Sequence, residues 1–215
     1  REQFGASSYS FPLTVGWSRD TRNDFLFPTS GMMQRLAAEW ATPLADLQYY
    51  KLSYQLQNYF PFRDVFSLLL NGEVGYGRGL NDKPLPFFKN FYAGGVNSVR
   101  GYTAGTLGPK DTNGDAIGGD TRVVANAELF FPVPGLRDDK SLRMSVFGDT
   151  GATFGPYDEF GRYSSFAFGD LRYSLGVAAL WVSPLGPLKF SVAQPLNSKP
   201  SDKTEVFQFT LGTTC

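Results

Sequence analysis

Hydrophobic and polar residues alternate with a period of two along most of the chain. From Tyr50 to Leu56, Tyr and Leu occupy the even positions, and Lys, Ser and Gln occupy the odd ones. Such alternation is typical of a β-strand with one apolar and one polar face. It recurs in nine segments, which are Phe11–Trp17, Met32–Trp40, Tyr50–Leu56, Phe66–Tyr76, Val123–Phe131, Leu142–Phe154, Leu171–Trp181, Leu188–Val192 and Phe207–Leu211. The pattern predicts an all-β, antiparallel fold.

The length of the segments favours a transmembrane β-barrel. Membrane strands have roughly 9–11 residues, whereas strands of soluble proteins have nearer 5–6, and most of these segments match the longer class. Aromatic residues gather near the segment ends, where a membrane barrel has its two interfacial girdles. They are Trp17, Trp40, Tyr59, Phe60, Tyr76, Phe131, Phe154 and Trp181. A soluble antiparallel β-sandwich shows the same alternation and remains the alternative.

The strand count is odd, although bacterial single-chain outer-membrane barrels have even numbers of strands. An open sheet would also leave unpaired edges in lipid, which is not a stable arrangement. The first residue is Arg1 rather than Met. We therefore expect that further N-terminal strands complete this barrel.

Composition excludes several classes of function. Lys and Arg number 20 and Asp and Glu number 20, so the chain lacks the basic surface of a nucleic-acid-binding protein. Histidine is absent, which excludes Ser-His-Asp and Cys-His catalysis and His-ligated zinc. The single cysteine, Cys215, permits no internal disulfide and no cysteine-cluster metal site. We expect a protein that is not an enzyme and that binds no cofactor and no metal.

One connection differs from the others. Gly79 to Thr121 is 43 residues long and shows no clear alternation. Connections beyond about 12–15 residues without secondary structure are usually functional or disordered. This one is rich in aromatic residues and paired glycines, which favour tight backbone turns in a packed segment. We expect residues 79–121 to form a functional loop.

The motifs of this loop resemble those of the BamA family, the insertases of the bacterial β-barrel assembly machinery. The motifs are Asn90–Gly95, Val99–Tyr102 and Gly108–Lys110, in that order. A Val-Arg-Gly-aromatic tetrapeptide, here Val99–Tyr102, marks the whole superfamily. Three further matches follow the family order along the chain, at Phe27–Gly31, Ser183–Leu188 and Phe207–Gly212.

The resemblance implies a domain organisation. The family barrel has sixteen strands, so residues 1–215 would be strands eight to sixteen, the C-terminal part of the barrel domain. The first seven strands and the periplasmic POTRA domains would be absent from this chain. Residues 79–121 would fold back into the lumen of the barrel.

The resemblance also implies a loop latch, in which the arginine of the tetrapeptide pairs with acids on the inner wall. The latch residues are Val99, Arg100, Gly101 and Tyr102, and the acceptors are Glu128 and Asp149. Alternation alone places both acids on the polar, inward face of their strands. Arginine suits this role because its planar fork of donors fits carboxylates bidentately. From the residues alone, these acids would be ordinary charges of the lumen.

The implied function is the folding and insertion of β-barrel proteins in the bacterial outer membrane. The family uses a lateral gate between the first and last strands, and the last strand here would be Val206–Thr214. An exposed strand edge can pair with an incoming strand. The gate residues are Phe207, Phe209, Leu211 and Gly212, the glycine weakening its strand. The implied partners are outer-membrane lipids, nascent β-barrel clients and accessory lipoproteins.

Two alternatives remain at this stage. One is a TamA-like or two-partner secretion transporter of the same superfamily, and the other is a soluble β-sandwich binding module.

The last residue departs from the family pattern. The last residue of family members is normally aromatic, and here it is Cys215. Cys215 shares its alternation with Phe207 and Phe209, so a lipid-facing aromatic would fit that position.

Overall fold

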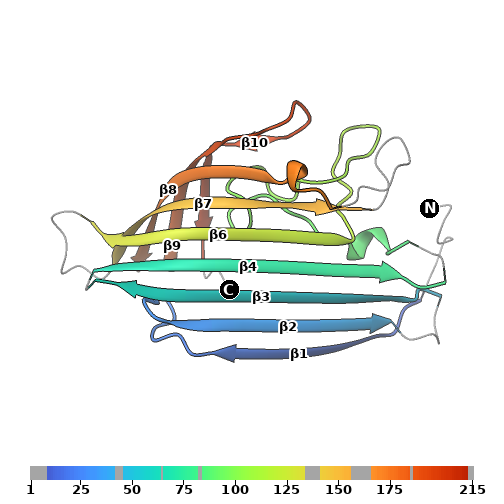
Figure 1. Cartoon of the computed structure of the whole chain (residues 1–215), viewed down its shortest axis with the longest axis horizontal. Helices are drawn as coiled ribbons and strands as arrows, with labels where there is room; N and C mark the ends of the chain where they lie inside the picture. The colour runs from blue at the N-terminus through green and yellow to red at the C-terminus, as the bar shows by residue number, and fades with distance from the viewer. Residues whose placement is uncertain are drawn as a thin grey trace.

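Nine antiparallel strands form one strongly curved sheet (Figure 1). The computed structural model describes residues 9–41, 46–63, 65–81, 84–133, 141–155, 166–184 and 186–212. The strands are β1 (Pro12–Asp20), β2 (Gly31–Ala41), β3 (Tyr49–Phe62), β4 (Phe66–Gly79), β6 (Thr121–Pro132), β7 (Leu142–Phe154), β8 (Arg172–Ser183), β9 (Gly186–Pro195) and β11 (Phe207–Leu211), in this spatial order. All nine predicted segments are therefore confirmed as strands. One continuous sheet also rules out the β-sandwich.

The two edges of the sheet are β1 and β11. Within the described ranges, β1 is paired with β2 alone and β11 with β9 alone. The β9–β11 ladder runs from Val192↔Phe207 to Leu188↔Leu211. The terminal strand thus has one neighbour in the sheet and one unpaired edge.

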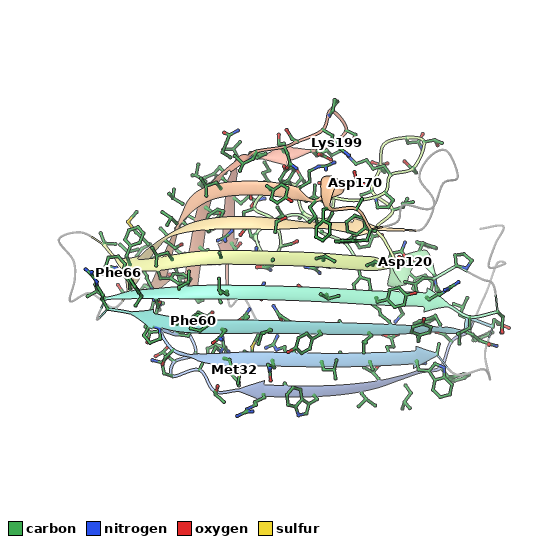
Figure 2. The ribbon with its side chains drawn as sticks, viewed as in Figure 1. Met32, Phe60, Phe66, Asp120, Asp170 and Lys199 are labelled. Atoms are coloured by element: carbon green, nitrogen blue, oxygen red, sulfur yellow. The ribbon has the colours of Figure 1, made fainter. Side chains whose placement is uncertain are left out.

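The sheet is apolar on its convex face and polar on its concave face. Successive side chains stand on opposite sides of each strand (Figure 2). Exposed apolar side chains on the convex face include Leu13, Val15, Leu52, Val74, Leu175, Val177 and Val192. Buried polar side chains on the concave face include Ser67, Glu128, Asp149, Ser174, Ser191 and Gln208. This inversion is what a barrel wall in lipid requires.

The eight aromatic residues near the strand ends divide into an exposed group, a buried group and Phe131, which is partly exposed. Trp17, Trp40, Phe60, Tyr76 and Trp181 are exposed, as a girdle requires. The girdle prediction is wrong for Tyr59 and Phe154, which are buried. Tyr59 stands at one of the alternate positions of β3 whose side chains point to the concave face. The ring of Phe154 is covered by Phe166, with the ring centroids 5.0 Å apart.

The connections lie at two different ends of the sheet. The β1–β2, β3–β4 and β8–β9 connections lie at one end, here called the short-turn end. Residues 79–121, here called the long loop, leave the sheet at the opposite end. In Figure 2, Phe60 and Phe66 mark the short-turn end, and Asp120, Asp170 and Lys199 mark the opposite end.

The long loop is a packed unit with structure of its own. It contains the 3-10 helix η1 (Phe87–Lys89) and the short strand β5 (Gly101–Tyr102), which pairs with β10 (Thr204–Glu205). Isolated bridges also join Phe91 to Gly119 and Ala93 to Leu107. Its own apolar cluster is Ala93, Val99, Tyr102 and Leu107. The loop is therefore ordered, as its composition predicts.

The long loop lies against the concave face of the sheet. At β3, the ammonium of Lys51 lies 4.0 Å from the ring centroid of Phe91. At β7, the hydroxyl of Thr153 donates to the carbonyl of Leu107 at 2.7 Å. Gly108, with φ +131°, passes so close to Thr153 that a Cβ there would overlap its side chain. Glycine at this position lets the loop touch the wall.

The described residues form only short helices, the second being η2 (Phe168–Asp170). None of them is long and apolar enough to cross a membrane.

Candidate functional site

The site is centred on the tip of the long loop, Val99–Tyr102. Glycines shape the approach to it, since Gly94, Gly95 and Gly101 all have positive φ. The amide of Gly95 donates to the carbonyls of Val99 at 3.2 Å and Tyr102 at 3.0 Å, which closes the tip into a compact turn. Val99 and Tyr102 are fully buried. The tip therefore presents Arg100 to the wall from a rigid backbone.

Arg100 is buried between two carboxylates. Its Nε donates to Oδ2 of Asp149 at 2.7 Å and its Nη2 to Oδ1 at 2.8 Å, a bidentate pair. Its Nη1 donates to Oε2 of Glu128 at 2.9 Å. The backbone N–H of Arg100 also donates to Oδ2 of Asp149, at 3.0 Å. Charge-assisted, bidentate bonds of this kind are the strongest side-chain hydrogen bonds in proteins.

An aromatic ring stacks against the guanidinium of Arg100. The guanidinium carbon lies 3.3 Å from the ring centroid of Phe147, which is 2% exposed. Phe147 pairs directly with Glu128 across β6 and β7. Because cation and ring face each other in a site shielded from water, the stacking adds to the ion pairs.

The two acceptors are held by neighbouring strands. Glu128 lies on β6 and Asp149 on β7, both on the concave face, with exposures of 4% and 3%. Ser145 donates its hydroxyl to Glu128 at 2.5 Å, and Asn126 donates its amide to Asp149 at 2.8 Å. Burying two charges is unfavourable unless every oxygen finds a partner, and these donors supply the remaining partners.

Asn126 also binds the loop itself. Its Nδ2 donates to the carbonyl of Ser98, the residue two before Arg100, at 2.6 Å. Its Oδ1 accepts from Asn71 on β4 at 2.7 Å, and Asn71 accepts from Gln55 on β3 at 3.2 Å. The latch is therefore continuous with an amide network that crosses four strands.

The arginine stays charged in this position. Burial alone lowers the pKa of Arg100, but the hydrogen bonds to Asp149 and the negative charge of Glu128 outweigh burial, so the pKa is raised above its usual value. The group is a permanent cation rather than a switch.

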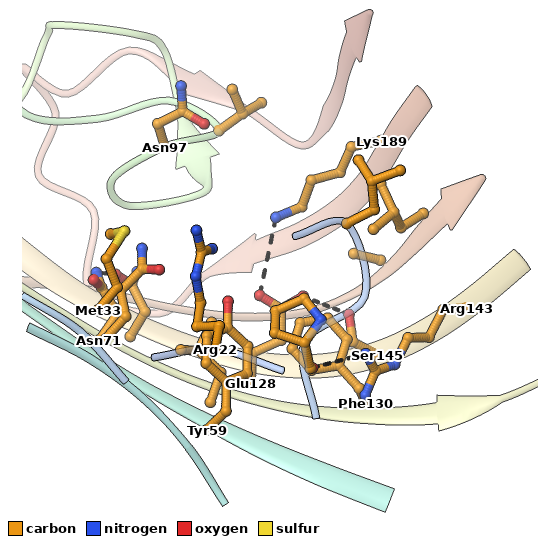
Figure 3. A pocket seen from close by; sticks show the side chains of 18 of the residues that line it. Arg22, Met33, Tyr59, Asn71, Asn97, Glu128, Phe130, Arg143, Ser145 and Lys189 are labelled. Atoms are coloured by element: carbon orange, nitrogen blue, oxygen red, sulfur yellow. Dashed lines mark hydrogen bonds and ion pairs between the residues drawn. The ribbon is translucent and has the colours of Figure 1, made fainter. Parts of the chain in front are cut away.

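A cavity of about 210 Å³ lies beneath the latch, towards the short-turn end (Figure 3). In Figure 3, the Lys189 ammonium reaches towards Glu128, with the two charged groups 3.9 Å apart. Arg22 and Arg143 also line the cavity. Arg143 donates to the carbonyl of Pro28 at 3.1 Å, so the β1–β2 turn reaches across the concave face to β7. The space beneath Arg100 is thus polar and largely cationic.

The opposite side of the tip binds the last strand. The Gln208 side chain on β11 donates through Nε2 to the carbonyl of Tyr102 at 2.8 Å. Its Oε1 accepts from the amide of Gly101 at 3.4 Å. The β5–β10 ladder adds the pairs Tyr102↔Thr204 and Gly101↔Glu205. The tip is consequently held from two directions.

Of the predicted latch residues, Arg100 meets Glu128 and Asp149, so the expected ion pairs are present. Val99 and Tyr102 instead pack with Ala93 and Leu107 inside the loop, and Gly101 bonds to Gln208. Phe207, Phe209 and Leu211 instead point outward, each at least half exposed. Gly212 follows β11 with φ +109°.

The bounds of the terminal strand differ from the prediction. β11 spans Phe207–Leu211, so Val206 and Gly212 of the predicted Val206–Thr214 lie outside the strand. Thr213, Thr214 and Cys215 lie outside the described residues.

Sequence reasoning missed four residues of the site, which are Asn126, Phe147, Lys189 and Gln208. Each occupies a position of its strand whose side chain points inward, and the alternation of the sequence could have shown this. Parity gives the direction of a side chain but not its partner, and these partners are distant in sequence.

In the described part of the chain, no group of three or more His, Cys, Asp or Glu side chains is arranged to hold a metal. The acidic stretch Asp111–Asp115 is a turn, in which the Asp111 carboxylate accepts from the amides of Asn113 and Asp115.

Comparison with known proteins agrees with the fold and the motifs. Outer membrane protein assembly factor BamA of Neisseria meningitidis serogroup B is 43% identical over 224 residues, covering 94% of this chain and 28% of that protein. BamA of Nitratidesulfovibrio vulgaris is 28% identical over 205 residues, covering 92% of this chain and 25% of that protein. The chain thus spans less than a third of the length of these relatives.

Solved structures give the same result. The crystal structure of Haemophilus ducreyi BamA lacking POTRA domains 1–3 superposes with a TM-score of 0.84 at 31% identity, covering 94% of this chain and 42% of that one. The Omp85 superfamily domain matches residues 4–215. With its nine-stranded antiparallel sheet, its apolar convex face and this match over nearly its whole length, the chain belongs to the Omp85 superfamily.

Proposed function

We propose that this chain is part of the barrel of an outer-membrane protein assembly factor, which folds and inserts other β-barrel proteins. The support is strongest in the match to a BamA barrel at TM-score 0.84 over 94% of the chain. Two BamA proteins cover more than nine-tenths of the chain in sequence. The location would be the bacterial outer membrane, and the role would be that of an insertase rather than an enzyme.

In this proposal, residues 1–215 supply nine strands of a larger barrel. Support comes from the two unpaired edges at β1 and β11 and from the fraction of the relatives that the chain covers. The remaining strands and the POTRA domains would belong to other parts of the polypeptide. The long loop would then occupy the lumen, with its tip on the inner wall.

The terminal strand would form one side of a lateral gate. β11 pairs with β9 over Phe207–Leu211 and exposes its other edge in the structure described. An unpaired edge is a template for strand addition, so a client strand could pair with it through main-chain hydrogen bonds. The exposed Phe207, Phe209 and Leu211 would meet lipid. Lipids, nascent clients and accessory lipoproteins are the proposed partners.

The loop latch would stabilise the barrel while the gate works. A gate needs one weak seam in an otherwise rigid wall. Arg100 joins the loop to β6 and β7, the wall adjacent to strands β8, β9 and β11. The latch is thus proposed as a structural brace and not as a catalytic group.

Depletion of the protein from the cells that produce it tests the proposed function. A broad loss of outer-membrane barrels together with loss of viability is the expected result. Loss of only one or a few clients with normal growth would contradict it and favour a TamA-like or two-partner secretion transporter.

A further inference from the structure

The strand β11 is held in the sheet mainly by its pairing with β9. One edge carries the ladder to β9, and the other edge is unpaired in the part of the chain that the structure describes. The outward side chains Phe207, Phe209 and Leu211 are exposed. Apart from the β5–β10 ladder, which ends at Glu205 just before the strand, any further restraint on β11 must come from its inward side chains.

β11 has two inward side chains, and they differ in their partners. Gln208 is 4% exposed and uses both ends of its amide on the loop tip, at Tyr102 and Gly101. Thr210 is the next inward residue, and its buried hydroxyl has no hydrogen-bond partner among the described residues. Gln208 is accordingly the side chain that fastens β11 to the loop.

The same short peptide carries the latch. The amide of Arg100 donates to Asp149 on β7, and the amide of the adjacent Gly101 donates to Gln208 on β11. Successive peptide groups are thus bound to opposite walls. The tip lies close to the wall, because a Cβ added at Gly101 would come within 3.1 Å of the Ala193 side chain on β9. Displacement of Arg100 would shift the atoms that Gln208 binds.

We infer that Gln208 couples the latch to the gate strand, so that engagement of Arg100 restrains β11 and its release frees β11. The inference deepens the proposed function, on which its meaning as a gate depends. Gln208 is a positioning residue in this view. It acts through the loop tip and not on the client.

Amide hydrogen exchange of Phe207–Leu211, in the intact protein in lipid vesicles, measures the restraint directly. Gln208→Leu removes both hydrogen bonds to the loop tip, together with the 3.5 Å bond to Glu205, at similar volume. We expect exchange of the β11 amides to become about tenfold faster, the change that loss of ordinary hydrogen bonds produces. Thr210→Val is the matched control, since it alters an inward side chain of the same strand that has no partner, and it should leave exchange within about twofold.

Coupling is tested by combining variants. Arg100→Lys keeps the positive charge but lacks the planar guanidinium that binds a carboxylate through two nitrogens. In the wild-type background it should accelerate hydrogen exchange of the β11 amides about threefold or more. In the Gln208→Leu background, Arg100→Lys should add nothing to β11 exchange. Additive effects of the two substitutions, or equal effects of Gln208→Leu and Thr210→Val, would overturn the inference.

Two further readouts keep the test decisive. If Gln208→Leu does not fold, Gln208→Asn shortens the same amide by one methylene and should give the same acceleration. Client insertion is measured separately on the same preparations. Coupled exchange without client insertion would sustain the inference and refute the proposed function, whereas client insertion with uncoupled exchange would refute the inference alone.

Discussion

Replacing Arg100 with alanine is the most informative single perturbation of the latch. The substitution removes the three side-chain hydrogen bonds to Asp149 and Glu128 and the stacking on Phe147. It leaves two carboxylates that are 3% and 4% exposed in the wild type. We expect a large loss of stability because buried charges without partners are costly.

The magnitude follows from what remains around the carboxylates. Removing one partner of a buried ion pair lowers the free energy of unfolding by about 3–5 kcal/mol. Glu128 keeps the Ser145 hydroxyl and the nearby Lys189 ammonium, and Asp149 keeps the Asn126 amide. Once the Arg100 side chain is removed, water can enter from the adjoining cavity of about 210 Å³, which Arg100 and Glu128 both line. These factors favour the lower half of the range, so we expect the free energy of unfolding to fall by about 3–4 kcal/mol.

Guanidinium unfolding of the protein in detergent micelles, followed by tryptophan fluorescence, measures this change. Arg122→Ala is a suitable control because Arg122 pairs with Glu73 at 3.1 Å in a more accessible part of the lumen, with side chains 18% and 21% exposed. Accessible pairs contribute about 0–1 kcal/mol. The difference between the two variants isolates the effect of burial.

If Arg100→Ala loses no more stability than Arg122→Ala, burial does not make the Arg100 ion pairs more stabilising than an accessible pair. A neutral version of the site offers a second check. Combining Arg100→Met with Glu128→Gln and Asp149→Asn removes the three charges of the latch, although the Lys189 ammonium then lacks its partner Glu128, and we expect the combination to recover about half of the lost stability. No recovery would mean that shape, rather than charge, holds the tip.

Three more predictions concern the loop and the wall. Gly108→Ala should lower the free energy of unfolding about 1–3 kcal/mol more than Gly114→Ala, since both have positive φ but only the first approaches the wall; chemical unfolding compares them. Asn126→Leu should accelerate limited proteolysis of the long loop by removing its bond to that segment, at a cost of about 1–3 kcal/mol; unchanged proteolysis would contradict this. Val177→Arg on the convex face should cost about 2–4 kcal/mol in vesicles, whereas Leu196→Arg beyond β9 should cost little, and equal costs would argue against a lipid-facing sheet.

The period of two was sufficient to predict the strands and their faces. It placed Glu128 and Asp149 on the inner wall because parity is a local property of the backbone. The long loop had no such period, and its role was predicted only through the resemblance of its motifs. What holds the loop there could not be read from alternation.

Contacts between distant segments escaped prediction for a physical reason. Gln208 and Gly101 are 107 positions apart, and nothing local to either residue specifies the other. Phe154 has the outward parity of its strand, but Phe166 from the next connection covers its ring. The sequence determines such packing only through the whole fold.

The folding rate of an unfolded β-barrel client, measured in vesicles that contain the intact protein and its accessory subunits, tests the central claim most directly. We expect faster folding than in empty vesicles and a marked reduction of that acceleration with Arg100→Ala. A rate equal to that of empty vesicles, with the protein shown to be folded, would contradict the proposed insertase function.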